Sequence, residues 1–143
     1  MHVAAILKAK GRAVETVAAD ETLGTVVALL AERRIGAVVV RQPSRAIAGI
    51  VSERDIVRML ARHGAATLAL PVSEAMTRDV VTCRETDTLD ELMSRMTEGR
   101  FRHLPVEDNG QLVGIVSIGD VVKHRVAEVE LEASAMRDYI ASA

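Results

Sequence analysis

The sequence has very few aromatic residues and a single cysteine. Aromatic residues make up 1% of its 143 residues, and tryptophan is absent. Modules that bind single-stranded nucleic acid stack bases on aromatic side chains, so the composition disfavours that class. The lone cysteine, Cys83, excludes an intrachain disulfide and a metal site built from several cysteines. Because 49% of the residues are apolar, a sizeable core can still form, and it must be aliphatic.

Long apolar runs and a strong net charge are also missing. No run reaches the roughly 18 residues that span a bilayer, and the first residues lack the pattern of a signal peptide. We therefore expect a cytoplasmic protein without a membrane partner. The formal net charge is −2, and no cluster of Lys and Arg lies along one helix without compensating acids. Nucleic acid is accordingly not an expected partner.

The two halves of the chain differ in charge. Residues 1–70 hold ten Lys or Arg against six Asp or Glu, whereas residues 71–143 hold eight against fourteen. The basic half could serve a ligand that carries phosphate, or it could meet the acidic half of a second subunit. The sequence leaves both interpretations open.

An internal repeat is the strongest feature of the sequence. Residues 14–60 align with residues 80–125, with a difference of one residue in the middle. The best-matched stretch is Gly-Ile-Val-Ser-x-x-Asp, which occupies 49–55 and again 114–120. A weaker similarity precedes the two copies. Val-Ala-Ala-Ile-Leu at 3–7, before the first copy, parallels Val-Ser-Glu-Ala-Met at 72–76, before the second.

Each copy has the pattern of strand, helix, strand, strand and helix. Strands are expected at 14–17, 37–41 and 47–51, and at 80–83, 103–107 and 111–116. The helices between them follow the potential N-caps Asp20, Thr22, Asp87 and Thr88. Asn109-Gly110 predicts a two-residue hairpin turn, and the link through Pro43-Ser44 is expected to be one residue longer. Each copy closes with a helix that begins at Ser52 or Ser117.

A unit this short, with three strands, cannot bury its own sheet. We therefore predict an α+β fold in which two units pack sheet to sheet with pseudo-two-fold symmetry. The expected parts are a first repeat, a crossover, a second repeat and a C-terminal helical extension, at 3–62, 62–79, 72–127 and 128–143. The last helix is expected to reach about Tyr139, with an apolar stripe at Val122, Val126, Val129 and Ala133. That stripe would either suit a partner helix or pack back on the globule.

These repeats resemble CBS domains, and two in tandem resemble a CBS pair, or Bateman module, of the stand-alone bacterial type. The resemblance covers residues 3–127 and rests on ordered landmarks: both Gly-Ile-Val-Ser-x-x-Asp stretches, Ala75-Met76-Thr77, and Arg-Phe-Arg-His-Leu-Pro-Val at 100–106. It implies a module that binds AMP, ADP, ATP, NAD(H) or S-adenosylmethionine as an effector, and that commonly forms a homodimer.

Two interpretations of Ser52 and Asp55 are compatible. Locally, the pair forms a capping box at a helix N-terminus. The same N-terminus would bind phosphate oxygens, with a hydroxyl from Ser52, and the carboxylate of Asp55 could accept hydrogen bonds from both hydroxyls of a ribose. Ser117 and Asp120 repeat the arrangement, and the resemblance favours ligand binding by at least one copy.

Further ligand contacts follow from equivalent positions in the two copies. Val17 and Cys83 are candidates for one wall of an adenine slot, and Ala37 and His103 for the other. Pro105 cannot donate in a strand ladder, so we expect it at an edge or strand opening that a ligand can reach.

Two basic residues are candidate phosphate partners, and each could equally be a solvated surface charge. They are Arg54 in the first copy and Lys123 in the second. The first copy has Glu53-Arg54 after its serine, whereas the second has Ile118-Gly119. We therefore expect two non-equivalent sites, the first better equipped for phosphate.

Motifs of catalysis are missing. The sequence has no dinucleotide-binding glycine motif, no Walker A sequence, no zinc-protease HExxH and no nucleophile elbow. The four histidines show no spacing of metal ligands, so we predict no metal. We expect a sensor rather than an enzyme, which signals through dimer rearrangement or a separate target protein. The alternative is a ligand-free scaffold for protein interaction or dimerisation.

Overall fold

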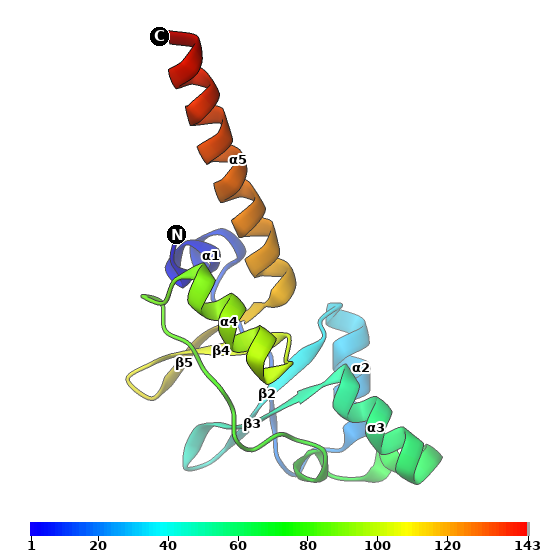
Figure 1. Cartoon of the computed structure of the whole chain (residues 1–143). Helices are drawn as coiled ribbons and strands as arrows, with labels where there is room; N and C mark the ends of the chain where they lie inside the picture. Colours follow the sequence, from blue (N-terminus) through cyan, green and yellow to red (C-terminus); the bar gives the residue numbers. More distant parts are fainter. Residues whose placement is uncertain (143) are drawn as a thin grey trace.

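Two similar halves lie against each other in the computed structural model, which describes residues 1–142 (Figure 1). The first half consists of β1 (Thr16–Ala18), α2 (Leu23–Arg33), β2 (Ala37–Gln42), β3 (Arg45–Ser52) and α3 (Glu53–His63). The second half consists of α4 (Leu89–Gly99), β4 (His103–Asp108), β5 (Gln111–Ser117) and α5 (Ile118–Ser142). A short helix, α1 (Val3–Lys10), opens the chain, and two 3-10 turns, η1 (Gly64–Ala69) and η2 (Val72–Glu74), cross between the halves.

The two sheets meet where β3 lies against β5, which confirms the predicted α+β fold. In the first sheet β1 pairs in parallel with β2, and β2 pairs antiparallel with β3. In the second sheet β4 pairs antiparallel with β5. Each half buries its own aliphatic cluster. The predicted C-terminal extension lies within α5, except for residue 143, which is outside the described residues.

The strand expected at 80–83 does not form, and this expectation was wrong. Cys83 alone makes a parallel bridge, to Val106, with its N–H donating to the Pro105 carbonyl at 3.0 Å. Val80 and Val81 make no ladder and instead line a cleft between the halves. The second sheet is therefore reduced to two strands.

Both hairpin loops contain two residues. Asn109 and Gly110 adopt φ of +49° and +78°, as the two-residue turn requires, so the predicted turn is confirmed. The expectation of a longer first link was wrong, because Gln42 pairs with Arg45 across Pro43-Ser44. The extra residue of the first copy is accommodated by a larger register shift between Val40 and Gln42.

The segment that precedes each half packs in the core of the other half; we call α1 and the crossover the two leading segments. The α1 helix contributes Val3, Ile6 and Leu7 to the core of the second half. In return the crossover contributes Val72 and Met76 to the core of the first half. The Val3 N–H donates to the Asp87 carbonyl at 2.9 Å, and the Val72 N–H donates to the Glu21 carbonyl at 2.8 Å.

Glycines at equivalent positions make this exchange possible. A Cβ on Gly114 would lie 2.6 Å from Leu7 Cδ2, and a Cβ on Gly49 would lie 2.7 Å from Met76 Sδ. Gly49 is the more constrained, because its Cβ would also lie 2.9 Å from the backbone oxygen of Thr77. The two Gly-Ile-Val-Ser motifs thus begin with a glycine because an exchanged segment packs directly on the strand.

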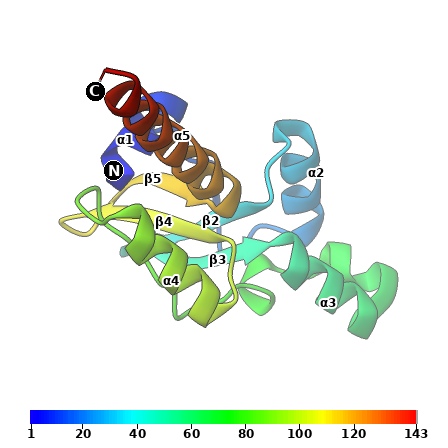
Figure 2. The ribbon, with the colours of Figure 1, turned by 45° about the horizontal axis from the view of Figure 1, so that its top comes forward.

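Helix α5 continues well beyond the globule (Figure 1), and in Figure 2 its last turns come forward in front of α1. Its first turns lie beside α1 and α4. Within residues 1–142, no helix is both long enough and apolar enough to cross a bilayer.

Replacing Gly49 by alanine should destabilise the fold by roughly 1–3 kcal/mol, because the new methyl overpacks the Met76–Thr77 segment. Gly114→Ala should cost clearly less, because the flexible Leu7 side chain can move aside. Urea unfolding followed by circular dichroism measures both. Equal losses in the two variants would contradict the role of the Thr77 backbone.

Cys83 should be nearly inert in the native protein. It is 2% exposed, and burial, with the charge of Asp87, raises the pKa of its thiol to about 12. The thiolate is the reactive form, so a disulfide reagent at pH 8 should react about a hundredfold or more slowly than with the protein in guanidinium chloride. Similar rates in the two states would show that Cys83 is accessible.

Candidate functional site

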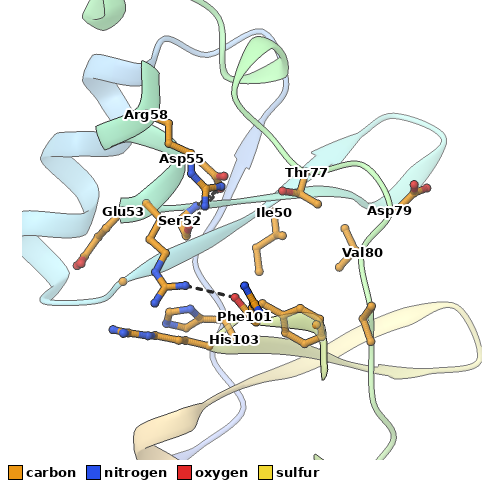
Figure 3. Close-up of a pocket in the computed structure, with 16 residues that line it drawn as sticks. Ile50, Ser52, Glu53, Asp55, Arg58, Thr77, Asp79, Val80, Phe101 and His103 are labelled. Atoms are coloured by element: carbon orange, nitrogen blue, oxygen red, sulfur yellow. Dashed lines mark hydrogen bonds between the residues drawn. The ribbon is translucent and has the colours of Figure 1, made fainter. Parts of the chain in front are cut away.

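A cleft of about 350 Å³ opens between the two halves. The first half contributes the end of β3 and the first turn of α3, the crossover contributes residues around Thr77–Val81, and the second half contributes the stretch from Gly99 to His103. Of the residues predicted from sequence, the cleft brings together Ser52, Arg54, Asp55 and His103. Figure 3 shows the labelled side chains converging on it from these three segments.

The polar end of the cleft is the N-terminus of α3. Ser52 precedes the helix, and both its N–H and its hydroxyl donate to Asp55 Oδ2, at 2.9 and 3.1 Å. Both side chains are half-buried. The predicted capping arrangement is therefore present, and it holds a carboxylate and a hydroxyl together at the mouth of a cleft.

Two arginines on α3 border this polar end. Arg54 Nη1 donates to the backbone oxygen of Arg100 at 3.3 Å and so connects α3 with the second half. Arg100 is the left-handed C-cap of α4, with a φ of +55°, which turns the chain into the cleft. Arg58 lies one turn beyond Arg54, and its side chain lies beside Asp55 in Figure 3.

The other end of the cleft is apolar. Ile50 and Val80 point from one side toward Phe101 on the other (Figure 3). The Phe101 ring lies directly over Gly99, so that any Cβ at position 99 would overlap it. This glycine thus permits the ring position that forms one face of the slot.

His103 joins the apolar and polar ends. It is half-buried at the start of β4, close to Gly36, and in Figure 3 it lies beside Phe101. Burial lowers the pKa of its imidazole below the ordinary 6.5, against the opposing charge of Glu53. The ring is therefore mostly neutral at pH 7.

The second motif, Ser117 and Asp120, differs from the first because a lysine binds its carboxylate. The Ser117 N–H donates to Asp120 Oδ2 at 2.9 Å, and the Asp120 N–H donates to Ser117 Oγ at 3.1 Å. Lys10, at the end of the exchanged helix α1, places its Nζ 2.6 Å from Asp120 Oδ2 and 3.0 Å from the Ile115 oxygen. Burial opposes ionisation of Asp120, but Lys10 and the Ser117 N–H hold the pKa of this carboxyl below 3.8.

The remaining predicted contacts lie outside the first cleft. Val17, Ala37 and Cys83 are at most 6% exposed, because tertiary packing turns them into the cores. Pro105 lies on β4, an outer strand of the two-stranded second sheet, as expected of a residue without an N–H, but it is buried and its carbonyl accepts the Cys83 N–H. Lys123 is exposed on α5.

Several lining residues were not predicted from sequence, and some carried a usable signal. Arg58 follows Arg54 by one helical turn and could have been assigned to the same helix face. Phe101 belongs to the Arg-Phe-Arg-His stretch that was recognised but given no role. Thr77, Asp79 and Val80 line the cleft only because the crossover folds back on β3, where Thr77 bridges to Ile50.

Comparison with known proteins places this geometry in a family. The sequence model described as CBS domain matches residues 11–62 and 72–127. The mitochondrial CBS domain-containing protein CBSX3 of Arabidopsis thaliana is 33% identical over 94% of this chain and 69% of that protein. A second Arabidopsis protein, CBSCBSPB2, is 30% identical, and the match spans 19% of its length.

Solved structures agree with the sequence comparison. A CBS-domain containing protein from Agrobacterium tumefaciens has a TM-score of 0.84 and 51% identity, over 87% of this chain and 92% of that one. A protein with CBS domains from Burkholderia ambifaria also has a TM-score of 0.84, with 43% identity over 89% of this chain and 95% of that one. This chain belongs to the CBS domain family: it is a tandem pair of CBS domains, a regulatory module.

Proposed function

We propose that the cleft between α3 and the Gly99–His103 stretch binds an adenosyl nucleotide as a regulatory effector. The observation that carries the proposal is the joint presence of a carboxylate at a helix N-terminus and an apolar slot within one cleft. The proposed ligand class is AMP, ADP, ATP, NAD(H) or S-adenosylmethionine. The proposal also includes a cytoplasmic homodimer that transmits the signal without catalysing a reaction.

The apolar slot suits a purine. Ile50 and Val80 would cover one face of the base, and Phe101 would cover the other. A neutral His103 ring adds a flat surface and a hydrogen-bonding nitrogen without a desolvated charge. Adenine would thus lie across the boundary between the two halves.

The polar end suits a ribose and its phosphates. Both local hydrogen bonds of Asp55 fall on Oδ2, so among the described residues its Oδ1 remains able to accept from a ribose hydroxyl. The N-terminus of α3 and Arg58 offer N–H groups and positive charge to a phosphate. Arg54 would do the same after releasing the Arg100 oxygen.

One solved structure supports the ligand class by fold alone. The CBS domain pair of protein MJ0100, in complex with 5′-methylthioadenosine and S-adenosylmethionine, has a TM-score of 0.79 but 22% identity with this chain. The shared element of those two ligands is an adenosine group. This fold can therefore hold adenosine, and the residues given above are our assignment for this chain.

The second motif is proposed to be the weaker site. A ribose that approached Asp120 would have to compete with the ammonium group of Lys10. By the alignment of the leading segments, Asp79 is the counterpart of Lys10; it lines the first cleft at the end away from Asp55 (Figure 3). The exchanged segments thus give the two motifs different charged neighbours.

A thermal-shift panel of AMP, ADP, ATP, NAD, NADH and S-adenosylmethionine tests the first site. At a hundred times its Kd, a ligand adds about 2.7 kcal/mol, which is a shift of several degrees in Tm. Asp55→Asn should weaken binding about tenfold or more, because the charged acceptor is lost. The equivalent change Asp120→Asn is the matched control and should leave first-site affinity unchanged.

Two results would contradict this function. If no ligand shifts the Tm at millimolar concentration, the protein is a scaffold rather than a sensor. If Asp55→Asn binds as the parent protein does, Asp55 serves only as a helix cap. The variant itself should lose only about 1 kcal/mol of folding stability.

Replacing Lys10 by methionine should open the second site. Methionine keeps the unbranched aliphatic stem but removes the charge that pairs with Asp120. Calorimetric titration should then report two adenosyl ligands per chain instead of one, and adding Asp120→Asn should restore the count to one. Two equal sites in the parent protein would show that Lys10 does not obstruct Asp120.

A further inference from the structure

Helix α5 is 25 residues long, and only part of it serves the globule. Val121 is buried in the core of the second half, and His124, Arg125 and Glu128 are half-buried on the same side. Arg125 there binds Glu128 at 2.7 Å. Beyond this point the helix projects away from both halves (Figure 1).

A second stripe of α5 is apolar and exposed. Its members recur at alternating intervals of four and three residues: Val122, Val126, Val129, Ala133, Met136 and Ile140. Val126 is 50% exposed, Met136 is 59% exposed and Ile140 is 67% exposed. Since successive residues of an α-helix are about 100° apart, this stripe lies to the side of the face that contacts the globule.

This spacing is the heptad pattern of a coiled coil, in which Val126, Ala133 and Ile140 occupy a positions and Val122, Val129 and Met136 occupy d positions. A projecting helix gains little stability by itself, because helices in water depend on packing of an apolar face. The stripe therefore fits another helix with the same repeat, and a second copy of α5 supplies one.

Charged residues beside the stripe distinguish between the two directions of pairing. In a parallel pair, residues at g positions face the e positions of the next heptad on the partner helix. Glu132 would then lie opposite the partner's Arg137, and Arg137 opposite the partner's Glu132, so this pair joins opposite charges. Arg125, the g residue of the preceding heptad, is held by Glu128 on the globule side and is not assigned to the seam.

An antiparallel pair of α5 helices that buries the whole stripe would place residues of like charge opposite each other. Lys123 would face the partner's Arg137, and Glu130 and Glu132 would each face their own copies. Like-charge contacts at these flanking positions destabilise a coiled coil and select against that orientation.

We propose that the α5 helices of two copies pair as a parallel, in-register coiled coil through the stripe from Val122 to Ile140. The seam gives the expected homodimer a defined surface and direction. It does not depend on the nucleotide proposal, because a chain that binds no nucleotide could still pair through this helix. Cross-linking therefore separates the failure of one proposal from the failure of the other.

Cysteine cross-linking tests the seam directly. In a parallel in-register pair, each d position lies beside its own copy, so Met136→Cys should form an intermolecular disulfide rapidly under mild oxidation. Leu131→Cys is the matched control, because Leu131 is 71% exposed on the opposite side of α5. The native Cys83 is buried and does not interfere. We expect cross-linking at position 136 at least tenfold faster than at 131, measured on non-reducing gels at micromolar concentration.

A charge exchange tests the direction. In the Met136→Cys background, Glu132→Arg should slow cross-linking severalfold, because it faces the partner's Arg137. Adding Arg137→Glu should restore the rate. Equal rates for positions 131 and 136 would overturn the coiled coil. A rate that Arg137→Glu fails to restore would overturn the parallel register.

Discussion

The mutual packing of leading segments on opposite strands governs the rest of this molecule. Leu7 occupies the space above Gly114, and Met76 occupies the space above Gly49. Neither half completes its aliphatic core without the segment that precedes the other half. The exchange therefore ties the halves together more firmly than contact between two small sheets would, since unfolding either half uncovers apolar surface in both.

The same exchange explains why the two motifs, so alike in sequence, differ in their surroundings. The crossover that delivers Met76 continues along β3 through the Thr77–Ile50 bridge, and this brings Asp79 and Val80 to the first cleft. The α1 helix that delivers Leu7 ends with Lys10 beside Asp120. A difference in the leading segments thus becomes a difference in charge at the sites, although Ser52 and Asp55 match Ser117 and Asp120. Duplication supplied two helix N-termini, and the segments packed against them made the two unequal.

The sequence predicted what depends on local pattern and on repetition. The order of the elements, apart from the strand expected at 80–83, the Asn109-Gly110 turn and the arrangement of Ser52 and Asp55 each follow from a few neighbouring residues, and the structure contains them. It did not predict which residues meet across the halves, because that depends on the exchange. Val17 and Cys83 were assigned to a wall of the slot from their strand positions, yet tertiary packing turns both into the cores. Phe101 and Val80 reach the cleft from segments that form neither helix nor strand in the structure, although a strand was expected at 80–83.

Helix α5 connects the second motif with the exposed stripe. Its first residue, Ile118, follows Ser117 directly, and Asp120 lies in its first turn. A change in how Asp120 is held, by Lys10 or by a ligand, would act on the first turn of a helix that is continuous over 25 residues. If two α5 helices are paired, a tilt of either helix must be matched by the partner or must separate the seam. A ligand can shift that balance only to the extent that it binds one arrangement more tightly than the other. Under the proposed function the two motifs would have separate consequences: a ligand in the first cleft would act on the contact between Arg54 and Arg100, whereas the second motif lies at the base of the helix that reaches outward.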